Sequence, residues 1–154
     1  MDYLVSESVL PDFGTFIGWP MYATNISWDD WQAGRSNEHK KPQPNQSDIE
    51  AAVRRLDSRQ YTIVIVEGRG EAHLAVGGGG GKYVVYATFD NRRFINLLGD
   101  TGLMGTEELL IGGQIGDYPV ARIVDRSRAM TAALTFARNG QLDPNFEWER
   151  QATE

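Results

Sequence analysis

Histidines and closely spaced carboxylates are the residues of this chain whose side chains could carry acid–base or metal chemistry. His39 and His73 are the two histidines, and they lie far apart in the sequence, with no HExxH pair to place two metal ligands on one helix face. Glu67 and Glu71 could form a carboxylate pair of the glycosidase type, although a chain with 21 acidic residues contains such spacings by chance. The sequence has no cysteine and no Gly-x-Ser-x-Gly motif. It therefore predicts no catalytic site, no metal site and no bound cofactor.

A run of glycines at residues 77–81 precedes Lys82 and invites comparison with phosphate-binding loops, whose backbone amides approach a phosphate closely. The spacing does not fit, because Val76 stands where such a loop needs its first glycine and Tyr83 where it needs serine or threonine. A strand-like segment follows the run, whereas the motif requires a helix. We interpret the run as a flexible connection between two strands.

Two tryptophans and two carboxylates lie within four residues: Trp28, Asp29, Asp30 and Trp31. Aromatic anchors ringed by charge are typical of protein recognition sites, because the rings exclude water and strengthen the ion pairs beside them. We expect Asp29 and Asp30 to be surface residues whose charges speed association with a partner. The alternative is that the tryptophans cover the open face of a sheet while the acids stay in water. Polar residues of two predicted turns complete the set of candidate partner-binding residues: Glu67, Arg69, Glu71, Asp90, Asn91 and Arg92.

The charge of the chain also limits its partners. A net charge of −6 and a sequence pI near 4.9 argue against direct binding of nucleic acid, which needs clustered Lys and Arg. Residues 1–38 hold most of the excess negative charge, with Arg35 as their one basic residue. This segment would suit a basic protein partner. The alternative is that the charge only keeps the protein soluble. No apolar run approaches the roughly 18 residues of a membrane helix, and no basic segment begins the chain, so we expect a cytoplasmic protein without membrane contact.

The periodicity of apolar residues locates most of the expected elements. Residues 1–46 contain four prolines and no sustained period, which indicates irregular structure with one short strand near residues 13–19. A capping box of Ser47 and Glu50 predicts a helix over residues 48–59. Four strand-like runs with short connections then predict an antiparallel meander, at residues 61–66, 71–76, 82–89 and 93–98.

The second half of the chain is less regular. Residues 99–120 are rich in glycine and predict one or two short edge strands, at 109–111 and 118–120. Asp125 as N-cap and Gly140 as C-cap predict a second helix over 126–138, and an extended tail follows at 142–149. A length of 154 residues fits one domain. The sequence thus predicts an α+β single domain over residues 1–154, with a mostly antiparallel sheet of about five to six strands packed with two main helices, residues 47–150 forming its core.

Several of these segments, taken in order, resemble a known family. They are the helix ending in Arg55-Leu56-Asp57, the strand at 61–66, the glycine break at 77–81 with Tyr83-Val84-Val85-Tyr86 after it, the stretch from Gly112-Gly113-Gln114 into Asp117-Tyr118-Pro119, and the terminal helix with Ala132-Ala133, Phe136, Gly140, Pro144 and Trp148-Glu149. This pattern, over residues 47–150, is similar to immunity protein family one of the bacterial polymorphic-toxin systems, in its actinobacterial form. Residues 1–46 lie outside the resemblance, which leaves the cluster of Trp28 to Trp31 without support from it.

The resemblance implies a cytoplasmic, non-enzymatic inhibitor without a cofactor. Such proteins bind and occlude the toxic C-terminal domain of a large secreted protein, often a nucleic-acid deaminase or another enzyme that acts in the cytosol, and so protect the producing cell in competition between bacteria. A toxin with a basic active cleft would complement the negative charge of this chain. Two alternatives remain: a small-molecule-binding protein or enzyme that uses a pocket on the sheet face, which requires convergent carboxylates, and an adaptor subunit of another assembly.

Overall fold

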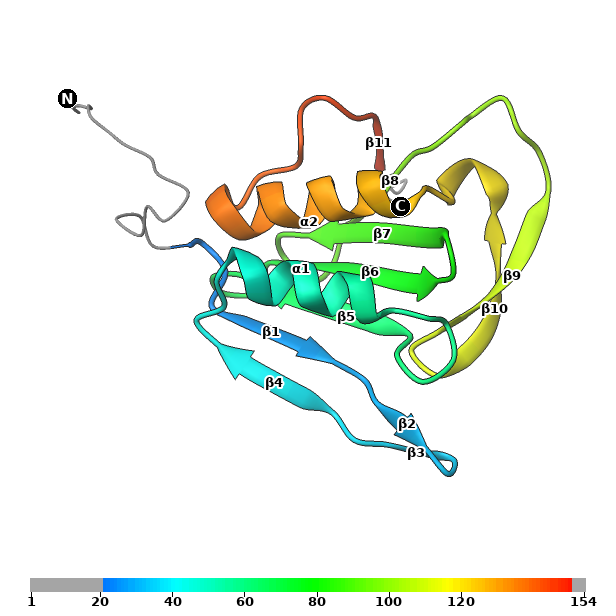
Figure 1. The fold of residues 1–154 in the computed structure, drawn as a ribbon. Coiled ribbons are helices and arrows are strands. Elements are labelled where there is room, and N and C mark those ends of the chain that lie inside the picture. The colour runs from blue at the N-terminus through cyan, green and yellow to red at the C-terminus, as the bar shows by residue number, and fades with distance from the viewer. Residues whose placement is uncertain (1–20, 151–154) are drawn as a thin grey trace.

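Seven strands form one antiparallel sheet, and both helices pack against the same face of it (Figure 1). The computed structural model describes residues 21–150. In spatial order the sheet runs β11 (Trp148–Arg150), β8 (Phe94–Leu97), β7 (Lys82–Thr88), β6 (His73–Gly79), β5 (Ile63–Glu67), β1 (Asn25–Trp28) and β4 (His39–Pro42). The α+β class and the four-strand meander are confirmed as β5 to β8. The predicted number of strands is too low, because three further strands extend the meander on its two sides.

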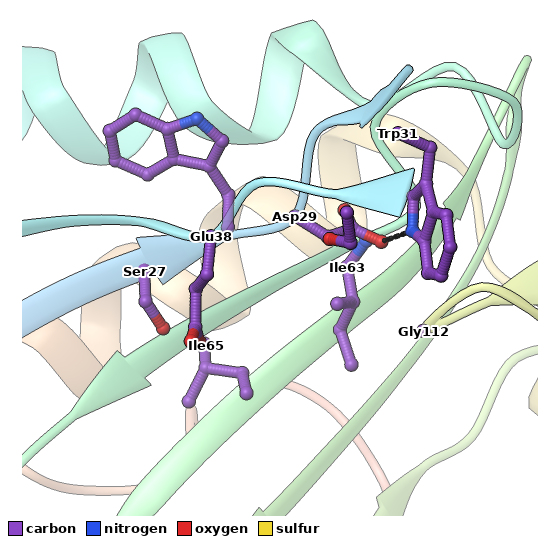
Figure 2. Close-up of a pocket in the computed structure, with 9 residues that line it drawn as sticks. Ser27, Asp29, Trp31, Glu38, Ile63, Ile65 and Gly112 are labelled. Atoms are coloured by element: carbon purple, nitrogen blue, oxygen red, sulfur yellow. Dashed lines mark hydrogen bonds between the residues drawn. The ribbon is translucent and has the colours of Figure 1, made fainter. Parts of the chain in front are cut away.

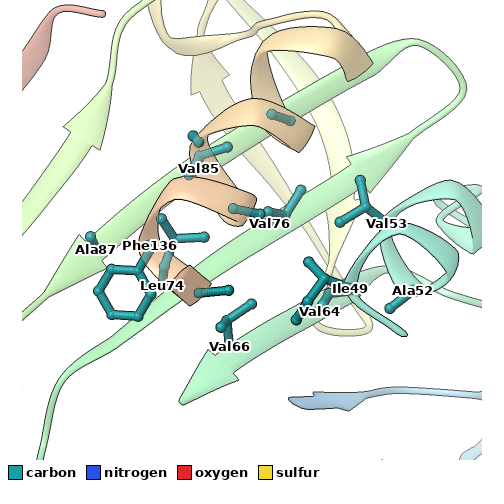
Figure 3. Close-up of a cluster of buried hydrophobic side chains, with 14 of the residues drawn as sticks. Ile49, Ala52, Val53, Val64, Val66, Leu74, Val76, Val85, Ala87 and Phe136 are labelled. Carbon is teal, nitrogen blue, oxygen red and sulfur yellow. The ribbon is translucent and has the colours of Figure 1, made fainter. Parts of the chain in front are cut away.

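The hydrophobic core lies between the sheet and the helices α1 (Gln46–Arg55) and α2 (Arg126–Asn139) (Figure 3). Alternate strand residues point into it, as the period of two requires, and Leu74 and Val76 of β6 are fully buried. Phe136 of α2 is the largest fully buried side chain. Each such burial stabilises the fold by roughly 1.5–3 kcal/mol. Four alanines of α2 are also buried, and their small side chains let this helix lie close to the strands: Ala129, Ala132, Ala133 and Ala137.

The helix ends show which capping signals in the sequence were interpreted correctly. Helix α1 begins two residues earlier than predicted, because Asn45 and Asp48 form the capping box: each side chain accepts a backbone N–H of the other at 2.9 Å. The predicted pair Ser47 and Glu50 is therefore wrong, and the helix ends at Arg55 instead of residue 59. Helix α2 has the predicted caps, with Asp125 at its start and Gly140 in the left-handed conformation at its end.

The glycine run at residues 77–81 connects two strands, β6 and β7, as predicted, but its first three residues are packed strand residues and not part of a flexible connection. Gly77 to Gly79 are strand residues of β6, and a Cβ atom on Gly79 would collide with the backbone of Asp57 and Ser58. One on Gly77 would collide with the side chain of Ile111. These glycines let two other segments approach the sheet closely.

Residues 25–42, predicted to be irregular, form a long hairpin. Its base pairs β1 with β4, and its tip pairs β2 (Trp31–Gln32) with β3 (Arg35–Ser36) around a turn at Ala33 and Gly34, both with positive φ. The strand β4 is exposed throughout and ends in a proline, so it lacks the alternation that marks a strand; a sheet edge tolerates this composition. The strand predicted near residues 13–19 lies outside the described residues.

The two strands predicted at 109–111 and 118–120 overlap the strands of a second hairpin, which pair with each other instead of lying at the edge of the main sheet. Strands β9 (Thr106–Ile111) and β10 (Gln114–Pro119) form a separate two-stranded sheet, followed by a short 3-10 helix (Val120–Arg122). Gly112 and Gly113 make its turn, with φ values of 63° and 79°. The hairpin curves away from the helices at one end of the sheet (Figure 1). The extended tail predicted at 142–149 is confirmed only at its end, where β11 pairs with β8, because a turn occupies residues 144–146.

Candidate functional site

The face of the main sheet that points away from the helices, here called the open face, carries half-buried apolar and aromatic side chains. The strand register places Ile65, Ala75, Tyr86 and Asn96 side by side across four strands. Tyr86 stacks edge-on against Phe94 with ring centroids 5.5 Å apart, and burial raises its pKa. Neither of the two helices within residues 21–150 covers this partly apolar face, and such a face is a natural surface for contact with another molecule.

Asp29 joins three segments of the chain beside this face. Its carboxylate accepts the backbone N–H groups of Thr62 and Ile63 at 2.7 and 3.0 Å. It also accepts the Thr62 hydroxyl and the indole N–H of Trp31, the latter at 2.8 Å. Thr62 Oγ1 in turn accepts the N–H of Gly113 at 3.1 Å. Through these bonds the carboxylate ties the β1–β2 segment to the start of β5 and, by way of Thr62, to the turn of the β9–β10 hairpin.

Asp30 is the centre of a second polar cluster on the same segment. Its carboxylate accepts hydrogen bonds from Gln60 at 2.8 Å, from His39 Nε2 at 2.9 Å and from Gln32 at 3.1 Å. These bonds, with that from Gln60 contributing most, lower the pKa of Asp30 to about 2. The ionised carboxylate thus holds the two sides of the long hairpin together and joins them to the segment before β5.

The two tryptophans of the cluster pack in different directions. Trp28 stacks on the ring of His39, with centroids 5.5 Å apart, and Arg55 of α1 lies 4.6 Å above its ring. Trp31 lies against Gly113, where a Cβ atom would collide with the indole. Both rings are half-buried. Part of the surface of the two tryptophans that we predicted to anchor a partner therefore packs within the protein itself.

A pocket of about 290 Å³ lies between the tip of the long hairpin and the open face (Figure 2). Its walls combine hydroxyls, two tryptophans, two carboxylates and two isoleucines: Ser27, Trp28, Asp29, Trp31, Ser36, Glu38, Ile63, Ile65 and Gly112. The carboxylate of Asp29 already accepts the four hydrogen bonds described above, whereas the side chain of Glu38, the other acidic wall residue, has no hydrogen-bond partner among residues 21–150. Among residues 21–150 no group of three or more His, Asp or Glu side chains could hold a metal ion.

The expectation that Asp29 and Asp30 are surface charges is wrong. Only 8% and 7% of their surfaces are exposed, and both are saturated with hydrogen bonds. The sequence correctly marked an unusual cluster. It could not show that these carboxylates accept hydrogen bonds from residues distant in the chain, because the spacing of residues reveals only local contacts. As contact residues for a partner, the cluster of Trp28 to Trp31 stays a prediction.

The remaining predicted contact residues lie at the opposite end of the strands. Glu67 is the last residue of β5, Arg69 and Glu71 lie in the β5–β6 connection, and Asp90 to Arg92 lie in the β7–β8 turn. The register of Glu67 with His73 and of Thr88 with Phe94 sets both connections at one end of the sheet. The structure thus brings these six residues to one end and separates them from the tryptophan cluster.

Several of the six have structural tasks. Asp90 accepts the N–H groups of Arg93 and Arg92 within its turn, which lowers its pKa, and Asn91 adopts a positive φ of 58°. Glu67 lies 3.5 Å from Lys40, and Arg69 lies 5.3 Å above the ring of Tyr22. Their role in binding stays a prediction.

Sequence reasoning missed a third surface, on the β9–β10 hairpin. Leu109 and Ile111 face the main sheet, while Glu108, Asp117 and Ile115 face outward and are exposed. Two glycines between six-residue runs are a hairpin signal that could have identified this element.

Comparisons with known proteins place the chain in a family. The family described as Immunity protein Imm1 matches residues 37–150, which include every strand from β4 onward and both helices. A comparison with curated proteins finds no match to the chain. Among the described residues, no helix is long and apolar enough to cross a membrane. Because the match extends over well more than half of the sequence, this chain belongs to the Imm1 family of immunity proteins.

Proposed function

We propose that this protein protects the cell that makes it by binding a toxin domain one to one and covering its active site. The observation that carries the proposal is the family match over residues 37–150. Immunity proteins act on toxins of the same competition system, and the toxin here would be a nucleic-acid deaminase or another enzyme active in the cytosol. We place the complex in the cytoplasm of the producing cell.

The charge of the chain supports a basic partner. A toxin that acts on nucleic acid needs a positively charged cleft to hold phosphates, and a protein with a net charge of −6 is attracted to such a cleft over distances comparable to the Debye length. Occlusion requires only a complementary surface. The carboxylates of Asp29 and Asp30 are engaged in internal hydrogen bonds, which agrees with occlusion because occlusion needs no free catalytic group.

The alternative of an enzyme or small-molecule binder receives little support from the pocket. Its volume of about 290 Å³ is at the lower limit for ligand sites. Acid–base chemistry of the glycosidase type needs two free carboxylates, and one of the two in this pocket, Asp29, is already bonded to Thr62, Ile63 and Trp31.

Co-expression tests the proposal. The protein is produced together with the toxin domain encoded immediately upstream, and growth and co-purification are scored. We expect growth to be restored and a complex to be isolated. Toxicity that persists with no complex formed would contradict the proposal and favour an adaptor role in another assembly.

A further inference from the structure

The outer face of the β9–β10 hairpin combines exposed apolar and acidic side chains. Ile115 is 70% exposed and lies opposite Leu110, while Glu108 lies directly opposite Asp117. The connection that leads into β9 adds Leu103 and Met104, which are 52% and 91% exposed. Among residues 21–150, three of the four exposed large hydrophobic side chains thus belong to this hairpin or to the loop before it. Such a concentration on one element is typical of an interaction surface.

The inner face holds this hairpin firmly to the body of the protein. Ile111 packs on Gly77, and Lys82 of β7 forms an ion pair with Glu107. The Ser58 hydroxyl donates to the carbonyl of Leu110 at 3.1 Å, and Gly113 N–H donates to Thr62 at 3.1 Å. The strands that carry the outer face are therefore held in place before a partner binds. Binding then costs little conformational entropy, because few further residues have to become ordered.

The acidic pair on this face is unfavourable in the isolated protein. Like charges directly opposite each other on paired strands repel, and neither Glu108 nor Asp117 has a hydrogen-bond or ion-pair partner among residues 21–150. By contrast Glu107, on the inner face, is paired with Lys82. A partner that places Lys or Arg between the two carboxylates would relieve this repulsion.

We infer that the outer face of the β9–β10 hairpin is the surface that docks the toxin domain, with Ile115 as the apolar anchor and Glu108 and Asp117 as the site of a basic group from the toxin. The inference rests on the proposed function and names its contact surface. Charge complementarity selects a basic protein partner over a second copy of this chain, because two copies would bring four carboxylates together.

Binding kinetics of purified variants test the inference. The partner is the toxin domain encoded immediately upstream, carrying a substitution that inactivates it. Glu108→Gln combined with Asp117→Asn should slow association about tenfold at low ionic strength and less at high ionic strength. Ile115→Ser should raise the dissociation constant about tenfold, mainly through faster dissociation. Thermal unfolding of each variant shows whether it is folded.

The matched control removes the same charge elsewhere, as Glu50→Gln on α1 combined with the exposed Glu147→Gln before β11. It should change both rate constants by less than about twofold. If the wild-type protein binds and the hairpin variants bind equally well, the inference is overturned while the proposed function stands. If the wild-type protein does not bind the toxin domain, the proposed function fails and the inference fails with it.

Discussion

The carboxylate of Asp29 accepts the backbone N–H of Thr62 at 2.7 Å, although one residue lies in the N-terminal hairpin and the other just before the central strand β5. Thr62 is fully buried and passes the connection on to Gly113 in the turn of the β9–β10 hairpin. Two peripheral hairpins are thereby attached to the same point of the main sheet. The stability of this junction determines how firmly the proposed docking surface is held.

Removal of the Asp29 carboxylate should destabilise the protein. In Asp29→Ala the buried N–H groups of Thr62 and Ile63 lose their acceptor, so we expect a loss of about 3 kcal/mol in the free energy of unfolding. Chemical denaturation measures this. The exposed neighbour Glu38 serves as the control, and Glu38→Ala should change stability by no more than about 0.5 kcal/mol. Equal stability of the two variants would show that the junction contributes nothing.

Substitutions at two adjacent glycines distinguish the cost of backbone strain from the cost of a steric clash. Both Gly112 and Gly113 have positive φ, but a Cβ atom on Gly112 meets nothing within 4 Å, whereas one on Gly113 collides with Trp31. Gly112→Ala should therefore cost about 1 kcal/mol of stability, and Gly113→Ala about 1–3 kcal/mol more. Thermal unfolding of the two variants gives the difference. An identical loss in both would mean that the Trp31 ring moves aside freely.

The environment of Asp30 predicts a pH dependence with a defined sign. Its pKa is lowered from 3.8 to about 2, so the ionised form stabilises the folded state above about pH 4, and this contribution is lost as the pH falls toward 2. In Asp30→Asn the free energy of unfolding should fall less steeply with decreasing pH over that range than in the wild type. Parallel pH profiles of the two proteins would contradict the hydrogen-bonded arrangement.

The ring of Trp148, in β11, covers part of the hydrophobic core. It packs against the buried cluster and donates its indole N–H to the carbonyl of Asp143 at 3.0 Å. Trp148→Ala should cost about 3 kcal/mol, because the ring is only half-buried, and Trp148→Phe about 1 kcal/mol through the lost hydrogen bond. Unchanged thermal unfolding of the alanine variant would make the ring a candidate contact residue instead.

The fold was predictable where apolar residues repeat with a clear period. Residues such as Leu74 and Val76, or Ala133 and Phe136, lie in the core because their spacing allowed no other face to be buried. The N-terminal hairpin was not predictable in this way. Its strand β4 is exposed along its whole length and is held by pairing with β1, which no local pattern records.

The candidate site was predictable in composition but not in geometry. The cluster of Trp28 to Trp31 was correctly singled out, yet its carboxylates are buried because residues Gln60 to Ile63, distant in the sequence, supply their hydrogen bonds. The sequence did not mark Ile115 and Asp117, because an isoleucine and an acid two residues apart are common. Their significance depends on the strand register, which places them opposite Leu110 and Glu108.

A titration of toxin activity distinguishes one-to-one occlusion of the toxin from its catalytic inactivation. Purified protein is added in increasing molar ratio to the toxin domain encoded immediately upstream, and residual toxin activity is recorded immediately and after prolonged incubation. Occlusion predicts that activity falls linearly to zero at one molecule of this protein per toxin domain, with no further change over time. Progressive loss of toxin activity at a much smaller molar ratio would show that the protein acts catalytically and would contradict occlusion.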